Sequence, residues 1–324
     1  MRAAFYETNG AAADVLRLED IATPSPGPGE VRIRMKTSGV NPSDVKSRAG
    51  LTRKIAYPRV IPHSDGAGEI DMVGDGVPAS RIGERVWTWN GQWRRAHGTA
   101  AEYVVLPQRQ AVPLPSNVSF EIGAGIGIPA MTAWYVVDLA NLSVGATVYV
   151  PGGAGAVGFY AIQFAKLRGA TVITTVSSSD KAELAKRAGA DHAINYKQED
   201  IAARVADITG KKGVDAIIEV DASANASLWP AILRPHAKVI VYGVGPQATI
   251  PGSFCLTNNI DVRFILVYEM PAADIDRALA DISKRLAEGR LVHNIAMTVP
   301  FADIVRAHEA VESGKTIGKV VVQI

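Results

Sequence analysis

A glycine-rich turn near the middle of the chain has the spacing of a phosphate-binding motif. Its six residues are Gly153, Ala154, Gly155, Ala156, Val157 and Gly158, which fit G-x-G-x-x-G. The turn follows a predicted strand ending at Val150 and opens a predicted helix. Glycine is required where a backbone turns tightly and approaches a pyrophosphate, and the helix N-terminus attracts the anion. The motif therefore predicts a dinucleotide site, against the alternative of a chance glycine-rich turn.

The next predicted strand, Thr171–Val176, ends in hydroxyl and basic side chains. Enzymes that use NAD commonly place an acid there, on the ribose diol. Here the first residue is Ser177, followed by Ser178 and then Lys181, which together could hold a 2′-phosphate. We therefore expect NADPH. The alternative is that Ser179 or Asp180 only caps the next helix and that Lys181 is a solvated surface charge.

The sequence offers no metal centre and no nucleophile. Cys255 is the only cysteine, and no G-x-S-x-G elbow is present. The other histidines show no metal-ligand spacing and are expected to be structural or exposed: His97, His192, His236, His293 and His308. We expect the nicotinamide to carry the chemistry by hydride transfer, while the protein positions the reactants and excludes water.

Two kinds of element pattern would position these residues. The first third of the chain contains β-like segments interrupted by turns: Val31–Lys36, Gly66–Val73, Arg85–Trp89 and Ala101–Leu106. From Val144 onward, apolar strands alternate with helices, which predicts a doubly wound parallel sheet. After a predicted strand at Phe264–Val267, a helix at Ala272–Gly289 and a strand at Gly318–Ile324 indicate a return to the first domain.

Composition narrows the class of protein. The chain has 324 residues, 48% of them hydrophobic, and a formal net charge of +2. This balance favours a globular protein of about two domains and gives no general attraction to nucleic acid or an anionic membrane. No signal peptide or membrane span is expected, and one cysteine suits a reducing compartment. We therefore expect a cytoplasmic protein.

Several short segments, in order along nearly the whole chain, carry a family resemblance. They are Gly39–Asp44, Asp65–Gly68, Gly83–Val86, Ile126–Ala133, the glycine turn, Ala188–Tyr196 and Gly318–Val320. Together they resemble the zinc-independent quinone oxidoreductases, the zeta-crystallin-like group of the medium-chain dehydrogenase/reductase superfamily.

The resemblance implies an α/β protein with two domains. Residues 1–122 and 269–324 would form a GroES-like β-barrel-type catalytic domain, and residues 123–268 a Rossmann domain that binds NADPH, with the active site in the cleft between them. The implied catalytic residues are Asn41, Asp44, Lys46 and Thr132. Besides the glycine turn, the residues implied for NADPH binding are Gly152, Ser177, Ser178, Lys181, Tyr196, Asn225, Gly243, Phe264, Ile265, Leu266 and Lys319. A homodimer through the strand near Phe264–Val267 is also implied.

The resemblance further implies that no zinc is bound. Asn41 stands where zinc-dependent relatives have a cysteine, and Ser64 stands where they have a histidine, with His63 one position out of register. The chain also departs from its group, because Lys46 replaces a frequent tyrosine. Another departure is the segment Trp87–His97, whose tryptophans either shape a flat substrate pocket or pack between loop and barrel.

Three functions remain open at this level. The first is an NADPH:quinone reductase that acts on a small quinone, and the second is a reductase of alkenals or enones on the same scaffold. The third is a binding protein of the crystallin or RNA-binding kind. The lack of a basic stripe counts against RNA as the main partner.

Overall fold

The computed structural model describes residues 1–324 and divides the chain into two compact units. Unit 1 comprises Met1–Ile128 and Leu279–Ile324, and unit 2 comprises Pro129–Ala278. The chain thus divides after Ile128 and after Ala278, whereas the expected domain boundaries lie after residues 122 and 268. Each lies inside a helix, α3 (Phe120–Ala140) or α10 (Ala272–Ala287), and the local sequence pattern does not mark such a position.

Unit 1 is built on a seven-stranded, mainly antiparallel sheet. Its path is β14 (Ile295–Pro300), β15 (Lys319–Gln323), β3 (Glu30–Val40), β4 (Asp65–Val73), β5 (Arg85–Thr88) and β7 (Ala111–Pro113), with β6 (Tyr103–Pro107) also paired to β3. A separate hairpin-like pair is formed by β1 (Arg2–Phe5) and β2 (Arg17–Asp20). The helices of this unit are α1 (Ala12–Val15), α2 (Pro42–Arg48) and α11 (Ile304–Glu312).

Strand β3 connects distant parts of the sequence within unit 1. It pairs antiparallel with β4 and β6 and also with the C-terminal β15, where Val40 lies opposite Val320. Alternate β3 side chains, Val31, Ile33 and Met35, enter the hydrophobic core. The last residues of β3 thus lie beside both the start of β4 and the start of β15.

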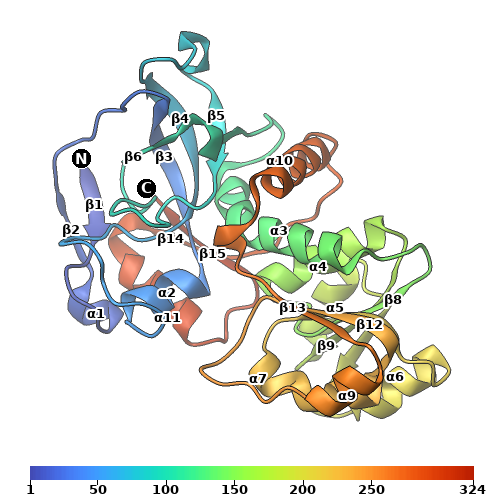
Figure 1. Cartoon of the computed structure of the whole chain (residues 1–324). Helices are drawn as coiled ribbons and strands as arrows, with labels where there is room; N and C mark the ends of the chain where they lie inside the picture. The colour runs from blue at the N-terminus through green and yellow to red at the C-terminus, as the bar shows by residue number, and fades with distance from the viewer. The chain divides into compact units, whose positions relative to one another are not determined.

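Unit 2 contains a six-stranded sheet in which all neighbouring strands are parallel (Figure 1). The order is β10 (His192–Asn195), β9 (Thr171–Val176), β8 (Thr147–Val150), β11 (Val214–Glu219), β12 (Leu233–Val241) and β13 (Asp261–Phe264). In chain order this is 3-2-1-4-5-6, the Rossmann arrangement. The predicted doubly wound sheet is confirmed.

Helices cover both faces of this sheet. They are α4 (Ala156–Leu167), α5 (Ser179–Arg187), α6 (Ile201–Thr209), α7 (Ala222–Asn225), α8 (Trp229–Ile232) and α9 (Gly252–Thr257). Side chains of α6, α8 and α9 share one core cluster with the strands, while α4 and α5 lie on the opposite face (Figure 1). Buried Trp229 is the largest member of that cluster.

One local prediction needs correction, and several elements were not predicted. The strand expected at Phe264–Val267 is misplaced, because β13 pairs with β12 only from Asp261 to Phe264 and Val267–Glu269 forms a 3₁₀ turn. Helix α3 was not predicted, because its glycines and Pro129 obscure the helical pattern. Helix α11 and strand β14 were also missed.

Helix α3 is the one helix long and apolar enough to cross a membrane by length and composition. Of its most apolar window, 83% is buried within the structure. A buried core helix passes the same test, so the composition of α3 has an ordinary explanation in packing.

Helix α2 begins with a reciprocal cap. The side chain of Asn41 accepts from the backbone of Asp44, and an Asp44 carboxylate oxygen accepts from the Asn41 backbone N–H at 2.8 Å. Burial, reinforced by the negative charge of Asp65, raises the pKa of Asp44 to about 7, although Lys319 and Arg53 act in the opposite direction. A carboxyl group with this pKa retains its proton in the folded protein after the unfolded chain has lost it.

We therefore expect Asp44 to make stability fall with pH. Between about pH 4 and pH 7 the unfolded chain binds fewer protons at this position, so the free energy of unfolding decreases by up to about 4 kcal/mol and then levels off. Asp44→Asn, which does not titrate, should lack this component in urea unfolding measured across the window. The matched control is Asp75→Asn, which removes an exposed carboxylate. A free energy of unfolding that rises with pH in the wild type relative to Asp44→Asn over this window would contradict the assignment.

Candidate functional site

The glycine turn of unit 2 connects β8 to α4. At several of its positions the backbone geometry requires glycine. Gly152 has φ +71°, which disfavours other residues. A Cβ on Gly153 would lie 2.2 Å from Thr174 Oγ1, and a Cβ on Gly158 would lie 2.6 Å from the Gly152 carbonyl oxygen. A Cβ on Gly155 would meet only the Gly152 carbonyl oxygen, at 3.2 Å. The first and third motif glycines are thus required by packing of the turn itself.

Two threonines that the sequence did not single out hold this turn. Thr174 Oγ1 accepts from the Gly153 N–H at 3.0 Å and donates to the Val150 carbonyl at 2.6 Å. Thr175 Oγ1 accepts from the Gly152 N–H at 3.3 Å. Both threonines lie on β9, which pairs with β8. The shape of the turn therefore depends on the neighbouring strand β9. It also depends on the register between β8 and β9, which no local sequence motif can indicate.

The predicted 2′-phosphate residues lie together at the end of β9. Lys181 Nζ donates to Ser177 Oγ at 3.0 Å. Ser178 caps α5 by accepting from the Lys181 backbone N–H at 3.4 Å, so the cap is Ser178 and neither Ser179 nor Asp180. The segment therefore both caps α5, through Ser178, and groups the side chains of Ser177 and Lys181. Lys181 is not an isolated surface charge.

A hollow of about 480 Å³ opens beside these residues. Ser177 and Ser178 line it together with Asn195, Lys197 and Gln198. No acidic residue is among its lining residues. A hollow with hydroxyl groups, a nearby ammonium group and no carboxylate is suited to an anion.

The remaining candidate residues of unit 2 follow the carboxyl ends of other strands. Asn225 follows β11, and its Nδ2 donates to Oε1 of Glu219, the last residue of that strand, at 2.7 Å. Gly243 follows β12, and a Cβ there would lie 1.8 Å from the Val220 carbonyl oxygen. Tyr196 follows β10 and is half exposed. Because the strands are parallel, these positions share one edge of the sheet with the glycine turn.

The other candidate residues of unit 2 lie either at the half-exposed end of β13 or inside a buried helix. Phe264 ends β13, and Ile265 and Leu266 follow it, with Phe264 and Leu266 each about half exposed. Thr132 is buried within α3.

In unit 1 the structure joins Asn41, Asp65 and Lys319 in a buried network. Lys319 Nζ lies 2.6 Å from Asn41 Oδ1 and 2.7 Å from Asp65 Oδ2. Asn41 Nδ2 donates to the same Asp65 oxygen at 2.8 Å. The exposed fraction of the side chain is 3% for Lys319 and 0% for Asp65, so water does not screen the pair. This network fixes which way the Asn41 amide faces.

Backbone geometry makes room for the network. The other Asp65 oxygen accepts from the Ile128 N–H at 2.7 Å. A Cβ on Gly127 would lie 2.3 Å from that oxygen, and a Cβ on Gly39 would lie 2.8 Å from Lys319 Cε. Asp65 was not predicted as a site residue, although the segment Asp65–Gly68 was visible as a motif. Lys319 was assigned to cofactor binding, and the structure gives it these two partners in unit 1.

The structure separates Lys46 from the other catalytic candidates. Asn41 and Asp44 cap the same helix, whereas Lys46 is an exposed residue on α2 without a recorded contact to the network. Of the predicted catalytic residues, the structure joins Asn41 and Asp44 through the helix cap, and Asp65, which was not predicted, also contacts Asn41.

His63, which lies next to the position where the resemblance implies a zinc-binding histidine, has other partners. His63, at φ +77°, places Nδ1 2.8 Å from Ser38 Oγ and Nε2 2.9 Å from His308 Nε2. Burial lowers the pKa of His308 to about 3 and holds the pKa of His63 well below its usual range, so both rings are neutral. No group of three or more histidine, cysteine or acidic side chains is arranged to hold a metal.

The tryptophans of the Trp87–His97 segment divide between the two alternatives. Trp87 and Trp89 are buried, which matches packing within the barrel. Trp93 is half-buried, and the guanidinium groups of Arg53 and Arg94 lie 5.2 and 5.6 Å from its ring. Of the three tryptophans, only Trp93 therefore contacts side chains at the surface, those of Arg53 and Arg94.

Both units match known families. Residues 27–116 match the alcohol dehydrogenase GroES-like domain, and residues 156–284 match the zinc-binding dehydrogenase family. A quinone oxidoreductase of Rattus norvegicus is 30% identical over 313 residues, which cover 95% of this chain and 93% of that protein. A 2-haloacrylate reductase of a Burkholderia species is 29% identical over 316 residues, covering 94% and 93% of the two chains.

Solved structures of oxidoreductases and related proteins also match the chain over its full length. A mycobacterial protein complexed with NADPH has a TM-score of 0.90 and 28% identity, and an NAD-dependent alcohol dehydrogenase has a TM-score of 0.91 and 30% identity. Each comparison covers 100% of both chains. With a GroES-like unit, a Rossmann unit and full-length similarity to quinone oxidoreductases, the chain belongs to the medium-chain dehydrogenase/reductase superfamily, among its quinone oxidoreductase-like members.

Proposed function

We propose that this oxidoreductase uses NADPH to reduce a quinone by hydride transfer, without a metal ion. The observation that carries the choice of cofactor is the Lys181–Ser177 contact beside a hollow free of carboxylates. An acid at this strand end would favour the ribose diol of NADH and repel a 2′-phosphate. The mycobacterial relative complexed with NADPH supports the same choice.

The residues of unit 2 fit a dinucleotide. The Gly152–Gly158 turn and the first N–H groups of α4 would hold the pyrophosphate, and Ser177, Ser178 and Lys181 would hold the 2′-phosphate. Tyr196, Asn225, Gly243 and the Phe264–Leu266 segment complete the proposed site. NADPH supplies a hydride from its nicotinamide ring when bound.

In unit 1 we assign orientation to Asn41. Its amide donates one N–H to Asp65, and its oxygen accepts from Lys319 and from the Asp44 backbone, which leaves one N–H for a further ligand. Because the network prevents an amide flip, the remaining N–H donor has a fixed position. Such preorganisation favours polar contacts with a flat carbonyl compound or with a carboxamide.

The same network argues against zinc at this position. The Lys319 ammonium group already lies at hydrogen-bond distance from both Asn41 and Asp65. A zinc ion bound about 2 Å from a ligand here would have to displace that cation or withstand its repulsion. A quinone suits a site without a Lewis acid, because it spreads the incoming negative charge over its ring.

An enone reductase is the second candidate, and the 2-haloacrylate reductase among the relatives favours it. Reduction of an activated carbon–carbon double bond uses the same hydride donor and needs no metal. The two functions differ in the shape of the acceptor, which substrate assays distinguish.

For assembly we propose a homodimer through the open edge of the unit 2 sheet. Strand β13 is the last strand in the order, and Phe264 and Leu266 are each about half exposed at this edge. An unpaired edge with exposed apolar side chains is suited to pairing with a second copy.

The cofactor assignment predicts a selective loss in Lys181→Met. Removing the ammonium group should raise the dissociation constant for NADPH at least tenfold, about 1.4 kcal/mol, because a charge-assisted contact is lost. Affinity for NADH should stay within about twofold. The matched control is Lys186→Met on the same helix, which should leave both unchanged. Equal weakening of NADPH and NADH in fluorescence titrations would refute the assignment.

The reaction predicts a ranking of acceptors in steady-state assays with excess NADPH. We expect 1,4-naphthoquinone first, the linear enone 3-penten-2-one second and cyclohexanone near background. A saturated ketone forms a localised alkoxide, which a bound metal ion stabilises best, whereas a quinone spreads the same charge over its ring. If the enone exceeds the quinone by tenfold or more, the second candidate replaces the first. A dominant saturated ketone would contradict both.

A further inference from the structure

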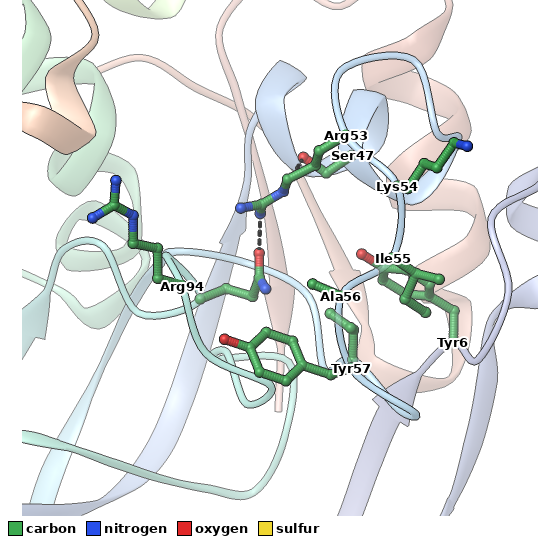
Figure 2. Close-up of a pocket in the computed structure, with 10 residues that line it drawn as sticks. Tyr6, Ser47, Arg53, Lys54, Ile55, Ala56, Tyr57 and Arg94 are labelled. Carbon is green, nitrogen blue, oxygen red and sulfur yellow. Dashed lines mark hydrogen bonds between the residues drawn. The ribbon is translucent and has the colours of Figure 1, made fainter.

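Unit 1 contains a second feature suited to recognition, a pocket of about 180 Å³ (Figure 2). Three of its lining residues are basic, Arg53, Lys54 and Arg94, and none is acidic. The aromatic residues Tyr6 and Tyr57 also line it. Sites for drug-sized ligands occupy about 300–1,000 Å³, so this pocket matches a small acid or one end of a substrate.

Arg53 is held in place by uncharged partners. Its Nε donates to Ser47 Oγ at 3.1 Å, and a terminal nitrogen donates to Gln92 Oε1 (Figure 2). Its guanidinium group also lies over the ring of Trp93, 5.2 Å from the centroid. These contacts restrict the side chain without neutralising it, and no acidic residue lines the pocket around Arg53. A half-buried arginine fixed in this way is preorganised for an anion.

The rest of the pocket adds no negative charge. Burial raises the pKa of Tyr6 to about 12, so its hydroxyl group is neutral at physiological pH. In Figure 2, the Arg53 guanidinium lies between Arg94 on one side and Lys54 on the other, and the Lys54 ammonium points away from it. Arg53 is therefore the fixed cation of the pocket, and exposed Lys54 adds a more distant positive charge.

The chain links this pocket to the Asn41 network. Asn41 is the cap residue at the start of α2, and Ser47, the partner of Arg53, lies near its end. Six residues of α-helix rise by about 9 Å along its axis, which is about the length of a small substrate, so α2 connects the two features over a short backbone distance. Arg53 also acts electrostatically on Asp44, the other cap residue of α2.

We propose that the pocket binds a carboxylate group of the hydride acceptor, so that the preferred substrates are conjugated carbonyl compounds that carry an acid. This inference rests on the proposed reductase function and narrows its substrate class. The carboxylate would accept hydrogen bonds from the guanidinium of Arg53, and its charge would be balanced in a partly desolvated setting.

The test compares an acidic enone with its neutral ester. Initial rates with NADPH are measured for (E)-4-oxopent-2-enoate and its methyl ester, using wild type, Arg53→Gln, Arg53→Lys and the control Arg17→Gln. Arg17 is exposed on β2 and does not line the pocket. Arg53→Gln should lower kcat/KM for the acid at least tenfold, mainly through KM, and change that for the ester by less than about twofold. Arg53→Lys should recover part of the loss, and Arg17→Gln should match wild type.

A binding measurement separates this inference from the proposed function. The saturated acid 4-oxopentanoate, which cannot accept hydride at a double bond, is titrated calorimetrically into each folded variant. Binding that weakens at least tenfold in Arg53→Gln, and less in Arg53→Lys, supports the pocket even if neither enone is reduced. In that case only the proposed reaction fails. Equal binding to wild type and Arg53→Gln, or no binding to wild type, overturns the inference, as does an equal loss of acid and ester turnover.

Discussion

The ammonium group of Lys319 organises the end of the unit 1 sheet. It is nearly inaccessible to water and contacts residues 278 and 254 positions away, Asn41 and Asp65. A buried charge is tolerated only when its partners satisfy it, and both partners here do so. The network joins the end of β3, the start of β4 and the start of β15, with Gly39 and Gly127 leaving space for it. The orientation of Asn41 and the local charge of the proposed site both depend on this cation.

Much of unit 2 could be predicted because its signals are local. The glycine turn, the alternation of strands and helices, and the Ser177–Lys181 segment each lie within a few residues of one another. The strand order then follows from ordinary βαβ handedness. Even here the support from Thr174 and Thr175 was missed, since it depends on the register between β8 and β9. The edge strand was misplaced because apolar residues continue beyond Phe264 after the pairing with β12 has ended.

The unit 1 site was harder to predict for a physical reason. Asn41 and Lys319 belong to different ends of the chain, and the spacing of residue types cannot indicate that they meet. Asp65 lies at the start of a strand, where a single carboxylate has many ordinary roles. Only pairing of β3 with both β4 and β15 brings the three side chains together. The resemblance points to Asn41 but does not supply its partners, and the role that it implies for exposed Lys46 stays a prediction.

The fixed cations of this protein are held in two different ways. Lys319 is satisfied by internal partners, whereas Lys181 and Arg53 are held by hydroxyl or amide groups and keep their positive charge available for a ligand. A nearly neutral protein can in this way present local sites for anions without a general attraction to polyanions. Under the proposed function, the chemistry depends on an electrophilic acceptor, because the cation beside Asn41 is an ammonium group rather than a metal ion.

The claim that hydride transfer proceeds with Lys319 in place of a metal can be tested by metal analysis of the active protein. Protein purified without chelators is analysed for zinc, dialysed against EDTA, and assayed with NADPH and 1,4-naphthoquinone before and after dialysis. The account predicts less than about 0.1 zinc per chain and a kcat/KM that dialysis changes by less than about twofold. About one zinc per chain, with activity lost on dialysis and restored by added zinc, would contradict it.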